Sequence, residues 1–161
     1  MIIIGYQGIG KSTLANTDNA YIDLESGNFW HKGKRCDNWY IYYGKIAEDL
    51  SRQNYNVFVS SHKEVRDYLK NSQEIVICVY PSILLAEKWK QKLKERYAKT
   101  QLTKDYKAWK NAEDRYLENI AELMMCGIPY IEINSLNYDL KNLIESADSS
   151  RFKQFDKKIK L

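Results

Sequence analysis

The sequence predicts an α/β fold in which a parallel sheet of about five strands is layered between helices. Three observations support this prediction. Short apolar runs alternate along the chain with longer segments of helical periodicity. The runs contain few polar residues at alternate positions, which is typical of strands covered on both faces. A glycine-rich segment also joins the first apolar run directly to a predicted helix.

The predicted strands end at polar residues or at glycine and proline. Asp23 follows the second run, a serine pair follows the third, and Asn134 follows the fifth. In parallel sheets ligands bind beyond the carboxyl ends of the strands, so these residues are the first candidates for a site. The five runs cover residues 1–4, 20–22, 55–59, 75–79 and 130–133.

Helices are predicted where apolar residues recur at steps of three and four. Leu85, Trp89 and Leu93 form one such stripe. A later stripe ends before Gly127 and Pro129, which are typical helix terminators. The predicted helices cover residues 11–17, 43–50, 63–69, 85–97, 109–123 and 136–144.

Residues 5–12 read GYQGIGKS, which fits the phosphate-binding pattern G-x-x-x-x-G-K-[ST] of nucleotide-binding proteins. The glycines allow a tight turn whose backbone amides can surround phosphate oxygens. Lys11 can reach the β- and γ-phosphates, and the hydroxyl of Ser12 can bind Mg²⁺. The alternative is a chance match, which the strand before the segment and the helix after it argue against. The predicted ATP contacts are Gly8, Ile9, Gly10, Lys11, Ser12 and Thr13.

Length and composition indicate one domain, covering residues 1–161. Lys and Arg number 25 against 21 Asp and Glu, which gives a net charge of +4. This mild excess suits a protein that handles phosphates and does not demand nucleic acid. The three cysteines lack metal-site or CxxC spacing, no apolar run is long enough to cross a membrane, and no leader precedes the glycine-rich segment. We therefore expect a cytoplasmic protein with reduced thiols.

The residues after the second predicted strand form another candidate group. Asp23 can hold the hydration shell of Mg²⁺ or accept a proton from a substrate hydroxyl, so we expect it to be catalytic and to help bind the metal. Its alternative role is to cap the next helix. Glu25 and Asn28 can hold a substrate, and the rings of Phe29 and Trp30 can stack on it. For the two rings, a hydrophobic cover over the core is an equal alternative.

A serine pair and a basic residue follow the third predicted strand. Ser60, Ser61 and Arg66 can bind an anionic group of the substrate. The alternative for Ser61 is a capping box with Glu64 at the start of the next helix. His62 is more simply explained as a structural residue, since it stands without a catalytic or metal-binding partner.

Basic residues crowd the predicted helix at residues 88–99, which reads KWKQKLKERYAK. We expect Arg96 to be catalytic by neutralising charge on a transferred phosphoryl group, and Lys92 to bind the nucleotide. The alternative is a solvated helix face. Residues 97–115 are expected to form a lid, from which Arg115, at the start of the returning helix, closes on phosphates.

These motifs resemble those of small P-loop kinases of the nucleoside/nucleotide-kinase and gluconate/shikimate-kinase group. GYQGIGKST matches the phosphate loop of that group, and Asp23 matches an acidic residue that contacts substrate or magnesium-bound water. VFVSSHKEVRDYL, residues 57–69, is similar to a gluconate-kinase segment in which a strand ends in a small polar pair before a basic residue and an Arg-Asp. KLKER, residues 92–96, resembles the Arg-Leu-x-x-Arg that leads into the lid, with Lys92 replacing the first Arg.

The resemblance implies a three-layer P-loop NTPase fold with strand order 2-3-1-4-5, a small helical lid, and Mg-ATP as the phosphoryl donor. The sequence departs from the group in two places. Lys92 is a point charge, so it cannot make the bidentate contacts of an arginine. Residues 25–39 do not match the gluconate or shikimate patterns, which argues against sugar-acid and shikimate substrates.

We therefore expect an ATP-dependent kinase that acts on a small acceptor, preferably a nucleoside monophosphate or deoxynucleotide. A nucleoside kinase, with Asp23 or Glu25 near the hydroxyl, and a 5′-hydroxyl polynucleotide kinase are alternatives. A nucleotide-binding protein or ATPase without kinase activity is a third, although the chain lacks the Asn-Lys-x-Asp of GTP switches and a strand that ends in adjacent Asp-Glu. The basic tail, residues 149–161, either docks on the body or is loose.

Overall fold

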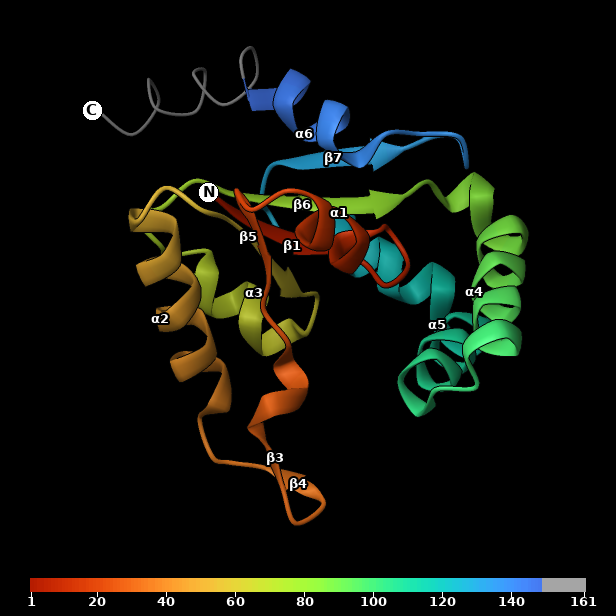
Figure 1. Ribbon diagram of the computed structural model, residues 1–161, viewed down its shortest axis with the longest axis horizontal. Coiled ribbons are helices and arrows are strands. Elements are labelled where there is room, and N and C mark those ends of the chain that lie inside the picture. The colour runs from red at the N-terminus through yellow and green to blue at the C-terminus, as the bar shows by residue number, and fades with distance from the viewer. Residues whose placement is uncertain (149–161) are drawn as a thin grey trace.

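The computed structural model describes residues 1–148, so the tail at 149–161 lies outside the described residues. Its centre is a sheet of five parallel strands in the order β2-β5-β1-β6-β7 (Figure 1). Counted along the chain, this is the predicted order 2-3-1-4-5, and the predicted α/β class is confirmed. The strands are β1 (Ile2–Gly5), β2 (Tyr21–Asp23), β5 (Asn56–Ser60), β6 (Val76–Pro81) and β7 (Tyr130–Ile133).

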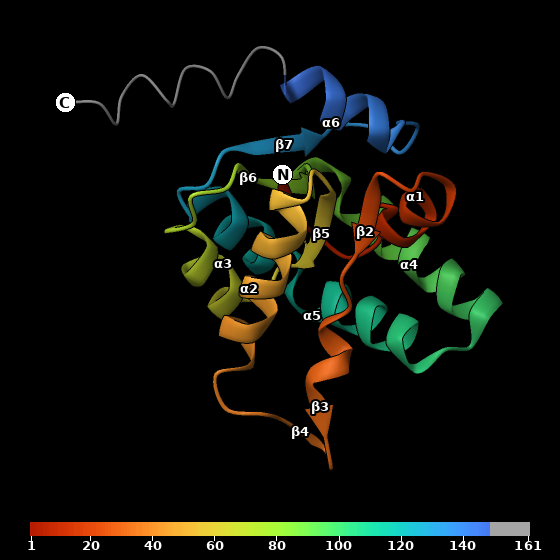
Figure 2. The same cartoon turned by 60° about the vertical axis from the view of Figure 1, so that its left-hand side comes forward.

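Helices cover both faces of the sheet. The step from β1 to β2 runs in the opposite direction to the later steps, so right-handed crossovers place α1 on one face and the later crossover helices on the other. Figures 1 and 2 show α1 and α6 on one side, and α2, α3 and α5 on the other. Within residues 1–148, no helix is long and apolar enough to cross a membrane. The helices are α1 (Lys11–Thr17), α2 (Trp39–Arg52), α3 (Lys63–Leu69), α4 (Ala86–Thr100), α5 (Thr103–Met125) and α6 (Leu140–Asp148).

The centre of the sheet is buried on both faces. Ile2, Ile3 and Ile4 of β1 have no exposed surface, and the same is true of residues 57–59 in β5. This burial explains why these runs lack the polar alternation of a half-exposed strand. Each large aliphatic side chain buried in this way contributes about 1.5–3 kcal/mol, so β1 is a rigid support for the loop that follows it.

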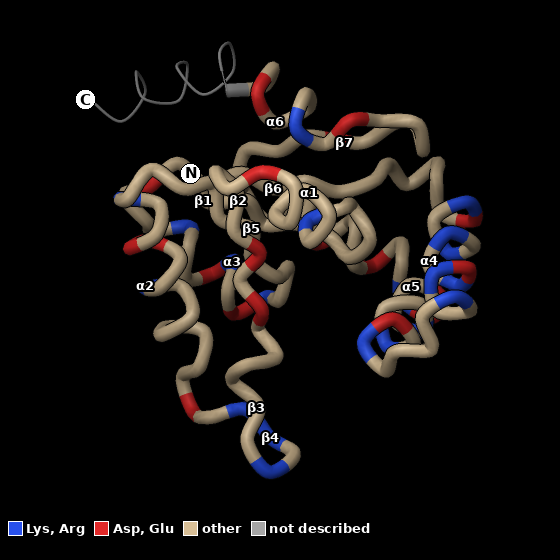
Figure 3. Tube along the Cα trace, in the orientation of Figure 1, with Lys and Arg blue, Asp and Glu red and all other residues tan. Residues whose placement is uncertain are grey.

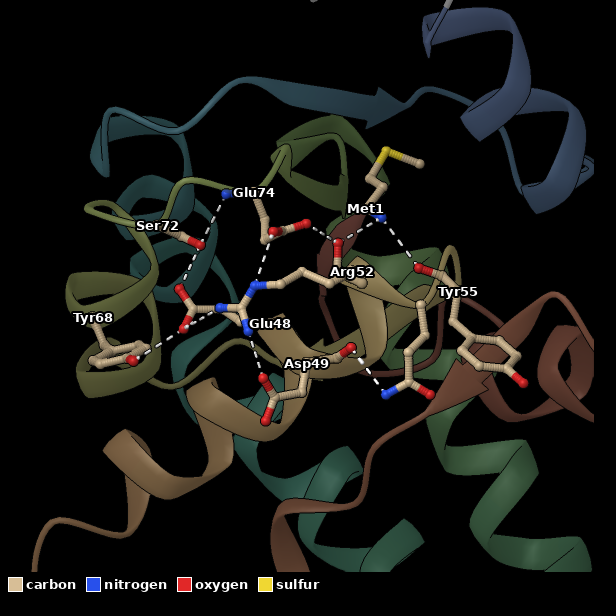
Figure 4. A network of polar contacts seen from close by, with 10 residues as sticks. Met1, Glu48, Asp49, Arg52, Tyr55, Tyr68, Ser72 and Glu74 are labelled. Atoms are coloured by element: carbon tan, nitrogen blue, oxygen red, sulfur yellow. Dashed lines mark hydrogen bonds and ion pairs between the residues drawn. The ribbon is translucent and has the colours of Figure 1, made fainter.

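A polar network fixes the start of β1 against α2 and the segment before β6 (Figure 4). The amino group of Met1 donates to Ser51 Oγ (2.9 Å) and to the carbonyl of Tyr55 (3.1 Å). Ser51 donates in turn to the carboxylate of Glu74, which lies 3.6 Å from Arg52 Nε. Because β1 is only four residues long, anchoring Met1, the residue before it, also fixes the position of the glycine-rich loop at its other end.

A small hairpin between β2 and α2 is not predicted from the sequence. Its strands, β3 (Trp30–His31) and β4 (Lys34–Arg35), are antiparallel and two residues long each, which is too short to show a periodic pattern. A short 3₁₀ helix, Ser26–Phe29, joins it to β2. In both views the hairpin projects away from the sheet and its helices (Figures 1 and 2).

The region predicted as a lid, residues 97–115, is helical. α4 ends at Thr100 and α5 begins at Thr103, so the two helices are joined by a very short turn. The chain is thus already helical before Arg115, where the sequence predicts that the returning helix begins. Arg115 lies inside α5 at a kink, where its φ of −139° and ψ of 22° depart from helical values. The Lys-rich stretch before Arg115 is itself a good helix former, which explains why α5 begins at Thr103, and the kink at Arg115 divides α5 into two helical parts.

Candidate functional site

The loop between β1 and α1 is a turn of unpaired backbone amides. Gly8 and Gly10 have φ of +85° and +101°, conformations that residues with side chains rarely adopt. A Cβ on Gly8 would also lie 2.7 Å from Leu93. Within residues 1–148, no backbone hydrogen bond uses the amides of residues 8–13 as donors. These amides are available for an anion, which is what the predicted ATP contacts at these positions require.

Two aromatic side chains hold the loop from outside. The indole Nε1 of Trp89 donates to the carbonyl of Gln7 (3.0 Å), and the hydroxyl of Tyr138 donates to the carbonyl of Ile9 (2.8 Å). These bonds fix the peptide planes of the loop. In the sequence, Trp89 belongs to an apolar stripe, and no pattern indicates a role for Tyr138. The only signal in the sequence is that each ring carries a polar atom that needs a partner when buried.

Lys11 folds back over the loop. Its ammonium donates to the carbonyls of Gly5 (3.0 Å) and Tyr6 (3.2 Å). Burial lowers the pKa of Lys11, and the charges of Asp23 and Glu25 partly offset this effect. A partly buried ammonium that is held by neutral carbonyls is stabilised further when an anion reaches it.

Ser12, in the first turn of α1, meets Asp23 at the end of β2. The hydroxyl of Ser12 donates to Oδ2 of Asp23 at 2.5 Å. Asp23 does not cap the 3₁₀ helix that follows, because that helix begins after Glu25 and has no side-chain cap. Hydroxyl and carboxylate oxygens are ligands that Mg²⁺ uses together with phosphate oxygens and water. The pair therefore fits a magnesium ion that is bound to a nucleotide.

Two cavities meet at the glycine-rich loop. The larger cavity, of about 750 Å³, lies between α1, α4 and residues 136–141. The smaller cavity, of about 400 Å³, lies beside it at the ends of β2 and β5 and is closed by the start of α5. Gly8, Gly10, Thr13 and Arg96 line both cavities. The smaller cavity also contains Lys11, Ser12, Asp23, Glu25, Ser60 and Lys104.

Arg96 and Lys92 extend from α4 towards the loop. Arg96 pairs with the buried Asp105 of α5 at 2.9 Å, and Asp105 accepts a second bond from Thr100 (2.6 Å). The Nε of Arg96 is buried and has no hydrogen-bond partner in the described part of the chain. Lys92 lies 4.1 Å from the centre of the Trp89 ring, and burial, assisted by Arg96, lowers its pKa. The side chain of Arg96 is nevertheless 39% exposed and lines both cavities, so its guanidinium can donate to a ligand where they meet.

A third cavity, of about 380 Å³, lies between the end of β1, the start of α3 and the middle of α5. The predicted substrate residues Ser61, Arg66 and Arg115 line it. Arg66 is buried and donates to Glu122 at 2.6 Å. Arg115 donates to the carboxylate of Glu118, which lies one turn further along α5. A substrate anion would therefore have to share these arginines with carboxylates.

The alternative role of Ser61 in a capping box with Glu64 is wrong. α3 begins after His62 and no side chain caps its first turn, because Ser61 lies one residue too far from the helix. His62 Nδ1 is instead 2.8 Å from Ser60 Oγ, and its ring packs edge-on against Trp39 with the centres 5.4 Å apart. His62 thus orients Ser60 at the edge of the smaller cavity.

Three predicted substrate residues do not line the three cavities described above. Phe29 packs against Tyr43 and Trp39, with ring centres 5.7 and 6.1 Å apart, which corresponds to the alternative of a cover over the core. Asn28 is exposed, and Trp30 is 51% exposed on the hairpin. The three residues are thus separated from the strand ends that hold the other candidates.

The chain matches no protein-family model and no curated protein. The residues that the structure brings together at the loop are Gly8, Ile9, Gly10, Lys11, Ser12, Thr13, Asp23, Glu25, Ser60, Lys92 and Arg96. Their chemistry and arrangement are the basis for inferring a function.

Proposed function

We propose that the chain is an ATP-dependent phosphotransferase. It moves the γ-phosphoryl group of Mg-ATP to a small acceptor, for which a nucleoside monophosphate or deoxynucleotide is the first candidate. The observation that carries this proposal is a turn of unpaired amides with Lys11 folded over it and Ser12 joined to Asp23. These are the groups that bind a triphosphate and its magnesium in P-loop proteins. The position of the turn, between the central strand and a helix, supports a P-loop fold.

Bound Mg-ATP would supply the phosphoryl group and a divalent charge that neutralises its oxygens. Lys11 would exchange the carbonyls of Gly5 and Tyr6 for phosphate oxygens. Arg96 would donate to the transferred group, since it lies where the two cavities meet. Neither side chain gives up or takes a proton. Catalysis would then depend on positioning and charge neutralisation.

The larger cavity has room for the nucleoside part of ATP. Its volume of about 750 Å³ is within the range of small-molecule sites. It adjoins the loop at Gly10 and Thr13, so a ligand whose phosphates lie on the amides extends directly into it. Tyr138 and Lys92 form part of its wall and provide a ring and a cation.

The smaller and third cavities provide a place for an acceptor on the other side of the loop. They share Gln7, whose side chain donates to the carbonyl of Ala108 at 2.8 Å and ties β1 to α5. Lys63, Arg66 and Arg115 line the third cavity together with one carboxylate, Glu122. Each of these cations is also paired with a carboxylate, so an anionic acceptor would have to share them with Asp67, Glu118 and Glu122. A phosphate acceptor also needs no general base, because it is already ionised.

A hydroxyl acceptor is the second candidate, and Glu25 is the observation in its favour. The side chain of Glu25 is 56% exposed in the smaller cavity, and its ion-pair partner among the described residues is Lys104 at 3.9 Å. A carboxylate placed there could accept a proton from a hydroxyl in transfer. A nucleoside or the 5′ end of an oligonucleotide would provide such a hydroxyl.

The test is an acceptor panel. Purified protein is mixed with Mg-ATP and with each nucleoside, each nucleoside monophosphate or a 5′-hydroxyl oligonucleotide, and ADP release is measured. We expect release above background with one or more monophosphates, and at least about a hundredfold less with Lys11→Ala. The matched control is Lys45→Ala, which removes an exposed lysine on α2. Release that needs a hydroxyl acceptor would select the second candidate, and release without any acceptor would identify an ATPase. If ADP were released under none of these conditions, the kinase with a phosphate acceptor, the kinase with a hydroxyl acceptor and the ATPase would all be rejected.

A further inference from the structure

The basic segment at residues 31–35 forms most of the projecting hairpin. Lys32 and Gly33 make its turn with φ of +49° and +82°, as in the two-residue turns that suit twisted hairpins. Lys32 and Lys34 are exposed. Figure 3 shows basic positions at the tip of the hairpin and again on the α4–α5 pair.

The hairpin is anchored to the body at its base. Arg35 pairs across the hairpin with Trp30. Its guanidinium lies 4.0 Å from the centre of the Trp39 ring and donates to Ser26 Oγ at 3.2 Å. Arg35 is therefore occupied by packing, whereas Trp30 remains 51% exposed. An exposed tryptophan on an anchored hairpin presents a rigid apolar surface. Packing within the protein does not explain this exposure, because a tryptophan that served only the core would be buried.

The start of α5 brings two more lysines to the same place. Lys107 Nζ lies 5.7 Å from the centre of the Trp30 ring, and Lys104 Nζ lies 3.9 Å from Glu25. Lys104 and Glu25 both line the smaller cavity. The surface thus begins at the mouth of that cavity and continues outward along the hairpin. We call Trp30, Lys32, Lys34, Lys104 and Lys107 the hairpin surface.

We propose that the hairpin surface binds single-stranded nucleic acid. The surface carries four exposed lysines, of which Lys104 has an ion pair with Glu25 at 3.9 Å, so it keeps a net positive charge that can follow a phosphate backbone. The exposed ring of Trp30 offers a face on which a base can stack. A lipid surface would require several exposed apolar side chains at the hairpin tip, and the tip instead carries lysines. Strand binding needs no phosphoryl transfer and stands apart from the proposed kinase activity.

Fluorescence anisotropy with a 3′-fluorescein-labelled oligothymidine of about 15 nucleotides tests this proposal. ATP and magnesium are left out, so that a protein without kinase activity gives the same result. We expect binding that weakens steeply between about 50 and 200 mM salt. The double variant Lys32→Ala/Lys34→Ala should bind about tenfold or more weakly, with a salt slope lower by about 1 for each lysine removed.

Trp30 tests the stacking contact separately from charge. Trp30→Ala should weaken binding about fivefold or more without changing the salt slope, and Trp30→Phe should restore much of the loss. The matched control, Lys45→Ala/Lys88→Ala, removes two exposed lysines from α2 and α4 and should bind like the parent protein. Thermal melting of each variant verifies that it is folded.

Three outcomes would overturn the proposal. The first is no binding at about 50 mM salt. The second is an equal loss of affinity in the α2/α4 control, which would mean that net charge alone attracts the strand. The third is equally tight binding to phosphatidylserine vesicles or to polyglutamate with the same dependence on Trp30, which would identify a general polyanion surface.

Discussion

Arg96 is a charged side chain that borders both cavities at the glycine-rich loop, and it is held there by an ion pair to the buried Asp105. We predict that Arg96→Ala lowers kcat by about 10²–10³-fold and raises the KM for ATP much less. The reason is that charge on the transferred group develops in the transition state. Steady-state kinetics with the acceptor found in the panel would measure both constants, with Lys88→Ala on the same helix as control. A change confined to KM would mean that Arg96 only binds the nucleotide.

Cys126 is a second residue whose chemistry depends on its neighbours. Its Sγ lies 3.7 Å from the Sγ of Cys78, although the two cysteines are far apart in the sequence. The bond from Cys78 lowers the pKa of Cys126 to about 6, and a backbone bond from Ile128 and the charge of Arg66 act in the same direction. The lowered pKa of the half-buried Cys126 favours its thiolate, whereas the interaction with Cys126, together with burial, raises the pKa of Cys78.

We predict that Cys126 reacts with iodoacetamide far faster at neutral pH than an ordinary thiol of pKa about 8.5. With its pKa depressed to about 6, the thiolate is present above that pH, and the rate should fall about tenfold from pH 7 to pH 5. Mass spectrometry of a Cys36→Ser variant, in which this exposed cysteine no longer competes, would give the rate. A rate that keeps rising steeply above pH 7 would contradict the depressed pKa, and Cys78→Ser should raise the pKa again.

At the scale of elements, the packing of α2 on α3 depends on one position without a side chain. Gly44 is buried in α2, and a Cβ there would lie 2.4 Å from ring atoms of Tyr68 on α3. Gly44→Ala should destabilise the protein by about 1–3 kcal/mol through overpacking, a loss reduced by the better helix propensity of alanine. Urea unfolding would measure the change. Gly27→Ala is the control, since nothing lies within 4 Å of the added atom. Equal stability of the Gly44 variant and the parent would show that the helices can separate freely.

Elements with strong local signals are the ones that the sequence predicts well. The helices at residues 11–17 and 63–69 have the expected bounds, and all five strands of the sheet lie within one or two residues of the predicted runs. These elements can be recognised from neighbouring residues in the sequence, either from glycine and proline at their ends or from a run of buried aliphatic residues. The β3–β4 hairpin has no such signal, because its strands have two residues each and its turn is Lys-Gly. The last helix begins at Leu140, later than predicted, since the stretch after β7 is used to wall the larger cavity.

The residues of the candidate site also differ in how well the sequence predicts them. Residues of the loop and of the strand ends can be placed from their spacing, because topology gathers strand ends at one edge. The supports contributed by Trp89 and Tyr138 cannot, since each bonds a loop carbonyl that is distant in sequence. The sequence also does not show which charged side chains form ion pairs with each other. The sequence shows no partner for Arg66, and only the structure shows that it is buried and paired with Glu122.

At the scale of the whole molecule, the larger cavity is assembled from three distant parts of the chain: the glycine-rich loop, α4, and residues 136–141. A nucleotide that contacts all three would connect them, and would stabilise the folded state only, because the unfolded chain has no such cavity. Binding at a hundred times Kd contributes about 2.7 kcal/mol, which for a domain of this size corresponds to a rise in Tm of about 5–10 °C.

We predict this rise for Mg-ATP, and a much smaller one for Lys11→Ala at the same concentration, because the variant loses the ammonium that faces the phosphates. Thermal melting monitored by circular dichroism would give both values, with adenosine as a ligand that lacks phosphates. The phosphates should contribute most of the rise, since the unpaired amides of residues 8–13 and Lys11 are hydrogen-bond donors that bind most strongly to an anion. If Mg-ATP and adenosine raised Tm equally, or if neither raised it, the loop would not be a triphosphate site, and the phosphotransferase proposal would lose its physical basis.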